Sequence, residues 1–76
     1  MTKGLNPDTK TGRINIKALE IVQNSPDGIR WTDLNKQIEE WDPQLHPKTI
    51  NGCTWQLTNN FPDKVTKTDG LFEWRG

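Results

Sequence analysis

The stretch HPKTINGCTWQL, residues 46–57, decides the fold that we expect for this chain. Pro47 suits the first position of a helix, because the N–H that proline lacks would be unbonded at a helix start. His46 then occupies the capping position, and Leu45 and Ile50 fall at the two positions of a hydrophobic staple. These signals predict that a helix begins at Pro47.

This helix, expected over about residues 47–58, has an inner and an outer face. The inner face holds Ile50, Cys53, Thr54 and Leu57. The outer face and its flanks hold Lys48, Thr49, Asn51, Gly52, Trp55 and Gln56. Asn or Gln can bind adenine through two hydrogen bonds in the major groove of DNA. Glycine costs a helix about 1 kcal/mol relative to alanine, but it would let a groove wall approach the backbone. The alternative is an ordinary solvated face, with Gly52 making room for a neighbouring element.

Trp55 is the unusual member of the outer face, because tryptophan side chains are mostly buried. Three explanations are open. Trp55 packs sideways against another element, contacts a protein partner at an interface where tryptophan is enriched, or lies against nucleic acid.

Two helices and a short strand are expected before this stretch. Apolar residues share one helical face over residues 14–24, at Ile14, Ala18, Ile21 and Val22. After the NSPDG turn, residues 29–31 form at most one edge strand. Thr32 is a candidate N-cap for a helix over residues 33–41, whose apolar face is Leu34, Ile38 and Trp41.

A β-hairpin is expected at the C-terminal end, over residues 64–74. Asp69-Gly70 is a strong two-residue turn signal. The turn pairs Val65 with Trp74, Thr66 with Glu73 and Lys67 with Phe72. Val65, Phe72 and Trp74 then supply the hairpin's contribution to the core. The segment TNNFP, residues 58–62, closes the preceding helix.

Composition excludes several classes of protein. With 76 residues, the chain makes one small domain. The formal net charge is zero, but residues 1–19 hold four basic groups against one acidic group, and residues 20–45 hold two against six. One cysteine and one histidine cannot build a zinc site, and no apolar run is long enough to span a membrane. We expect a cytoplasmic protein without catalytic activity, metal or cofactor.

The order of helix, short strand, two helices and hairpin resembles the plan of a winged-helix domain, an α+β fold that is mainly α. The strings DGIRWTDL, HPKTINGCTWQL and FPDKV…GLFEW are similar to small winged-helix modules attached to bacterial and phage restriction and other DNA-handling proteins. We therefore expect a flexible N-terminal arm over residues 1–12 and a winged-helix domain over residues 13–75. The resemblance implies that the third helix enters the major groove of double-stranded DNA and that the hairpin, the wing, touches the DNA backbone or minor groove.

Phosphate contacts are expected from outside the third helix as well as from Lys48. Lys64, Lys67 and Thr68 lie in the wing, and Arg13 and Lys17 follow the basic arm. The alternatives are a solvated wing and an arm that is a plain linker. With so few basic groups, an isolated monomer should bind DNA weakly. The rival hypothesis is a protein-interaction domain, with a partner protein or a second copy bound through Trp55 and the acidic second helix.

Overall fold

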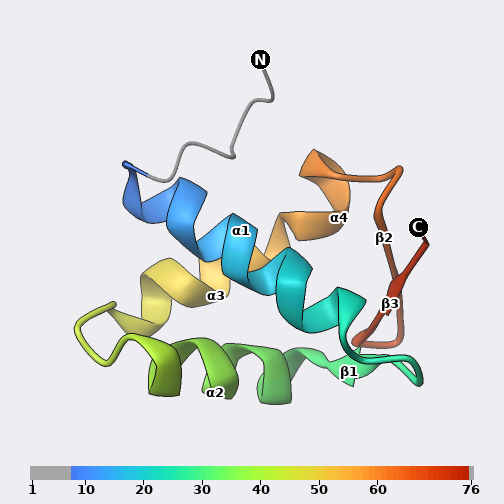
Figure 1. The fold of residues 1–76 in the computed structure, drawn as a ribbon, viewed down its shortest axis with the longest axis horizontal. Helices are drawn as coiled ribbons and strands as arrows, with labels where there is room; N and C mark the ends of the chain where they lie inside the picture. The colour runs from blue at the N-terminus through green and yellow to red at the C-terminus, as the bar shows by residue number, and fades with distance from the viewer. Residues whose placement is uncertain (1–7, 76) are drawn as a thin grey trace.

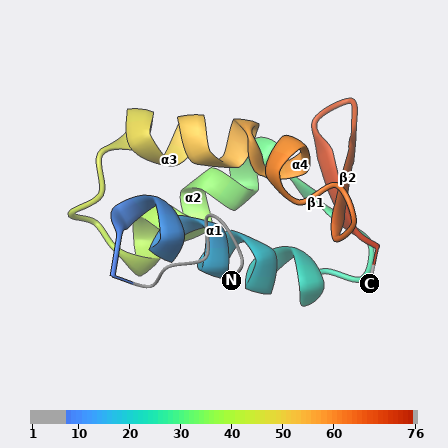
Figure 2. The ribbon, with the colours of Figure 1, turned by 90° about the horizontal axis from the view of Figure 1, so that it is seen from above.

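A computed structural model describes residues 8–75 of the chain (Figure 1). The fold is α+β and mainly helical, with one three-stranded antiparallel sheet in the described part. Its elements are α1 (Lys10–Gln23), β1 (Ile29–Arg30), α2 (Trp31–Trp41), α3 (Pro47–Trp55), α4 (Leu57–Asn60), β2 (Val65–Thr68) and β3 (Leu71–Trp74). Figure 2 shows α1 and α3 on opposite sides of the molecule, with the β2–β3 hairpin beside the C-terminal end of α3 and α4.

The sheet confirms the hairpin that the sequence predicts. Its strand order is β1-β3-β2, and Val65, Thr66 and Lys67 pair with Trp74, Glu73 and Phe72. Asp69 and Gly70 have φ of 52° and 81°, as expected of a turn whose two central residues are left-handed. β1 adds the third strand through the pair Ile29 and Phe72, which gives a lone hairpin the support that it needs in water.

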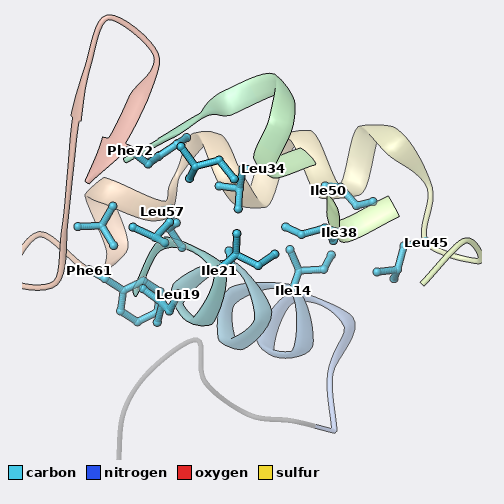
Figure 3. Close-up of a cluster of buried hydrophobic side chains, with 14 residues drawn as sticks. Ile14, Leu19, Ile21, Leu34, Ile38, Leu45, Ile50, Leu57, Phe61 and Phe72 are labelled. Atoms are coloured by element: carbon cyan, nitrogen blue, oxygen red, sulfur yellow. The ribbon is translucent and has the colours of Figure 1, made fainter. Parts of the chain in front are cut away.

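The core fills the space between the helices and the inner face of the sheet (Figure 3). Each Å² of apolar surface that folding takes from water stabilises the folded state by about 25 cal/mol. Burial of this cluster therefore holds the elements together. The cluster contains Ile14, Ala18, Leu19, Ile21, Val22, Ile29, Leu34, Ile38, Leu45, Ile50, Leu57, Phe61, Val65 and Phe72. Leu45 and Ile50 of the predicted staple are both in it. Trp74 packs partly buried against it.

α1 begins at Lys10, earlier than the residue 14 predicted from apolar spacing. The side chain of Thr9 caps it by accepting a hydrogen bond from the N–H of Gly12 at 2.9 Å, which is the usual bond of a threonine N-cap. The last residues of the predicted arm are therefore helical. Residues 1–7 of that arm lie outside the described residues.

α2 differs from the prediction at both ends. It begins at Trp31, with Arg30 as N-cap, so Thr32 lies in the first turn and is not the cap. The N–H of Trp31 donates instead to the carbonyl of Gly70 at 2.8 Å, a contact between distant segments that capping rules do not include. At the other end Trp41 is 40% exposed and not part of the core. The chain turns after Trp41, and the buried Leu45 closes that end of the core.

The predicted helix over residues 47–58 is two helices. α3 ends at Trp55, and α4 follows after Gln56, whose N–H bonds to the carbonyl of Gly52 at 3.2 Å. The change at Gln56 lets both Leu57 and Phe61 reach the core. Phe61 lies in the segment that the sequence interpretation treated only as the end of the helix.

Candidate nucleic-acid interface

The outer face of α3 is exposed along its whole length. His46 caps the helix, with Nδ1 accepting from the N–H of Lys48 at 3.1 Å. On the inner side Ile50, Thr54 and Leu57 are buried, while Cys53 is partly buried. The residues predicted to lie outward are all exposed: Lys48, Thr49, Asn51, Gly52, Trp55 and Gln56. The periodicity therefore assigned the two faces of α3 correctly.

Gly52 is not explained by packing within the described residues. A Cβ atom added to Gly52 would have nothing within 4 Å, and its backbone is helical. The alternative interpretation, in which this glycine makes room for a neighbouring element, is therefore wrong for the described part of the chain. Gly28 is the opposite case, because its φ is +85° and an added Cβ would lie 3.0 Å from the carbonyl oxygen of Phe72.

Trp55 packs sideways against both α2 and the hairpin and still exposes 54% of its surface. Its ring meets the ring of Trp31 edge-on, with the centroids 5.4 Å apart. The ammonium group of Lys67 lies 3.7 Å from the centroid of the Trp55 ring, within the range of a cation–π interaction. The packing explanation for Trp55 therefore holds, although the exposed part of the ring remains available to a partner.

A chain of hydrogen bonds links α2 to the outer face of α3. Nε1 of Trp31 donates to Oγ1 of Thr54 at 2.9 Å, and the Thr54 hydroxyl donates to Oδ1 of Asn35. Nδ2 of Asn35 then donates to Oδ1 of Asn51 at 3.0 Å. Thr54 is fully buried, so its hydroxyl needs these partners. Asn51 is thus fixed through its side-chain oxygen.

The hairpin places two of its three predicted site residues near its turn. Lys67 and Thr68 precede the turn in β2, whereas Lys64 lies before the strand begins. Lys67 lies on the same inner face of the hairpin as Val65, two residues before it, so its stem runs along the protein and its charged end reaches Trp55. Lys64 and Thr68 are exposed. Figure 2 shows the hairpin turn on the same side of the molecule as α3.

Arg13 and Lys17 of α1 lie next to each other, beside Trp41. Both contact the ring of Trp41, with their charged groups 5.1 and 5.5 Å from its centroid. Arg13 also forms a salt bridge of 3.0 Å with Asp42. Ile16, which is 37% exposed, lines the same shallow hollow. The structure therefore does not bring Arg13 and Lys17 to the outer face of α3.

The described residues offer little for bond-making chemistry. Burial raises the pKa of the Cys53 thiol above its ordinary value, although a hydrogen bond with the side chain of Thr11 opposes the shift. A thiol with a raised pKa is a poor nucleophile at neutral pH. Between residues 8 and 75, the structure contains no cluster of three or more side chains suited to hold a metal ion. Nor does any helix in that range have the length and apolarity to cross a membrane.

Comparison with protein-family models, with curated proteins and with solved structures finds no match for this chain.

Sequence patterns did not predict that Asn35 and Trp31 belong to this site. Asn35 follows the buried Leu34 and has the appearance of a solvated polar position on α2. Its partners, Thr54 and Asn51, are 19 and 16 residues away. The available signal was the i, i+3 spacing of Asn51 and Thr54 on α3, which places a buried hydroxyl beside an exposed amide.

Proposed function

We propose that this chain is a winged-helix module that binds double-stranded DNA without catalysing a reaction. In this proposal α3 enters the major groove and the β2–β3 hairpin is the wing that contacts the DNA backbone. The observation that carries the proposal is that the outer face of α3 is exposed to solvent. It combines exposed polar side chains with a glycine that has no packing role among the described residues.

The dimensions and chemistry of this face support the proposal. A helix with its side chains is about 10–12 Å wide, and the major groove of DNA is about 12 Å wide. Gly52 narrows α3 at the centre of its exposed face, which brings the backbone closer to the groove floor. Asn51 and Gln56 lie one position to either side of the central Gly52–Trp55 segment, where amide groups can reach base edges.

Cationic groups at both ends of the face would contact phosphates. Lys48 is in the first turn of α3, where the helix dipole also favours an anion. Lys67 and Thr68 lie near the hairpin turn at the other end, and Lys64 lies at the base of the hairpin. Asp63, Asp69 and Glu73 oppose this charge on the hairpin, so we expect weak binding with a shallow dependence on salt.

Fluorescence anisotropy with a labelled duplex of mixed sequence, at low salt, tests this proposal. Lys48→Gln and Lys64→Gln should each weaken binding and lower the slope of log affinity against log salt by about one. Lys36→Gln is the matched control, because Lys36 is an exposed lysine of α2 that lines a hollow with Gly28 and Leu71. The proposal would be overturned if Lys48→Gln and Lys64→Gln lost no more affinity than Lys36→Gln, or if the wild-type protein bound no duplex at millimolar DNA.

A protein-interaction module is the second candidate. It is favoured by the 54% exposure of Trp55 and by the carboxylates of α2 at Asp33, Glu39 and Glu40. Trp55→Ala should then abolish capture of a partner protein, or self-association in sedimentation, while the fold stays intact. Unchanged association in a folded Trp55→Ala variant would count against this candidate.

A further inference from the structure

Asn51 is held in one orientation by a hydrogen bond from α2. Asn35 Nδ2 donates to Asn51 Oδ1 at 3.0 Å, so the oxygen of the Asn51 amide is directed toward α2. Among residues 8–75, no group accepts a hydrogen bond from Asn51 Nδ2, although Asn35 and Thr54 beside it are both hydrogen-bonded. The exposed end of the Asn51 side chain is therefore its NH₂ group, which can only donate.

The hydrogen bonds of Thr54 support this orientation of the Asn35 amide. Trp31 Nε1 is a donor only, so Thr54 Oγ1 must accept from it and use its own hydrogen elsewhere. Three oxygens lie within reach of that hydrogen, namely Asn35 Oδ1, the Ile50 carbonyl at 3.1 Å and the Asn51 carbonyl at 3.2 Å, and Asn35 Oδ1 is the nearest of them. The amide of Asn35 lies with its oxygen toward Thr54 and its nitrogen toward Asn51. The group that Asn51 presents outward therefore depends on the orientation of the Asn35 amide.

We infer that Asn35 is a positioning residue that makes Asn51 a hydrogen-bond donor, and that the base facing Asn51 is guanine. This inference rests on the proposed function, since it names the chemistry that the outer face of α3 would recognise. A bidentate bond to adenine needs the Asn oxygen to accept from the N6 amino group, and that oxygen is already turned toward Asn35. Guanine presents two adjacent acceptors in the major groove, N7 and O6, whereas thymine presents O4 alone and adenine sets its N7 beside a donor amino group. Guanine is therefore the base that an outward NH₂ group matches best.

Asn35→Asp is the sharpest variant, because it keeps one contact and reverses the other. A carboxylate at this position still accepts the Thr54 hydroxyl, but it cannot donate to Asn51. The Asn51 amide should then turn over, donate to the new carboxylate and present its oxygen outward. The preferred base would change from guanine to adenine or cytosine, which carry amino groups in the major groove.

The experiment selects bound duplexes from a randomised DNA library with the wild-type protein, Asn35→Asp, Asn35→Ser and Gln37→Glu. Wild type should prefer guanine over adenine at one position by roughly fivefold or more. Asn35→Asp should reverse that preference, and Asn35→Ser should reduce it. Gln37→Glu adds the same negative charge to α2 at an exposed position and should leave the preference unchanged. Identical base preferences in wild type and Asn35→Asp would overturn the inference and leave DNA binding itself intact.

The free protein supplies a second readout that does not depend on DNA. Side-chain ¹⁵N relaxation of the Asn51 NH₂ group should report an ordered amide in wild type, more rigid than the exposed Asn60, and a mobile one in Asn35→Ser. An Asn51 amide as mobile in wild type as in Asn35→Ser would overturn the positioning role. If wild type is ordered but binds no duplex, the proposed function fails and the assignment of guanine fails with it, while the positioning role stands.

Discussion

The ammonium group of Lys67 lies 3.7 Å from the centroid of the Trp55 ring, and this contact joins the hairpin to α3. It explains how a tryptophan stays on an exposed helix face. One part of the ring meets Trp31, another part is covered by a cation, and the rest faces water. The same contact holds the hairpin at the end of α3, so the two parts of the proposed interface are placed relative to each other.

Lys67→Gln should destabilise the fold by about 0.5–1 kcal/mol, the usual contribution of a cation–π pair at an exposed site. Urea unfolding followed by tryptophan fluorescence measures this change. Lys64→Gln is the control on the same hairpin, and its effect should stay within about 0.5 kcal/mol, as for most surface substitutions. Equal effects of the two variants would mean that the contact with Trp55 adds nothing to stability.

Gly52→Ala should stabilise the protein by about 1 kcal/mol, because alanine is a better helix former than glycine and the new Cβ meets nothing within 4 Å. The same variant should weaken DNA binding, since the methyl group would lie between the backbone and the groove floor. Thermal unfolding and anisotropy measure the two effects. Gly28→Ala is a contrasting variant and should destabilise strongly, because of its positive φ and the nearby Phe72 carbonyl. Tighter DNA binding by Gly52→Ala would contradict the proposed close approach.

Thr54→Val should cost about 1–3 kcal/mol of stability. The substitution keeps the shape of the side chain but removes the hydroxyl that accepts from Trp31 and donates to Asn35, and a buried polar group without a partner carries a penalty of that size. Thr49→Val, at an exposed position of the same helix, should change the free energy of unfolding by less than about 0.5 kcal/mol. Chemical denaturation of both variants checks this prediction. A neutral Thr54→Val would show that the hydrogen-bond chain is not formed.

Cys53 should react slowly with iodoacetamide at pH 8 in the folded protein and rapidly in urea. Burial raises the pKa of its thiol above the ordinary value of 9.0, so less thiolate is present in the folded state than in the unfolded state. The same shift predicts that folding stability falls as pH rises through 9.0, because the unfolded chain then loses this proton first. Comparison with Cys53→Ala isolates the thiol's part of that decline. Equal alkylation rates with and without urea would refute the prediction.

Local patterns were enough to predict the two faces of α3 and the order of the elements, apart from the break that separates α4 from α3. The Asp69-Gly70 turn fixed the hairpin register, since a two-residue loop leaves one way to pair its strands. The apolar spacing around Ile50 separated buried from exposed positions because α3 is a regular helix. Patterns of this kind work where a structure depends on neighbours in the sequence.

Several of the errors involve contacts between distant segments. Trp31 begins α2 because its N–H donates to the carbonyl of Gly70. Thr32 is therefore not the N-cap that the sequence predicted. Trp41 has core spacing but is exposed, and its ring contacts the cations of Arg13 and Lys17. The orientation of Asn51 depends on Asn35, and no periodicity in either helix indicates that bond.

A titration of ¹⁵N-labelled protein with a mixed-sequence duplex at low salt tests the central claim most directly. If α3 and the hairpin bind DNA, the backbone amides of residues 48–56 and 64–70 should shift with added DNA, and those of residues 13–20 on α1 should stay in place. No shift in residues 48–56 at millimolar DNA, or shifts concentrated around Trp41 and α1, would contradict the claim.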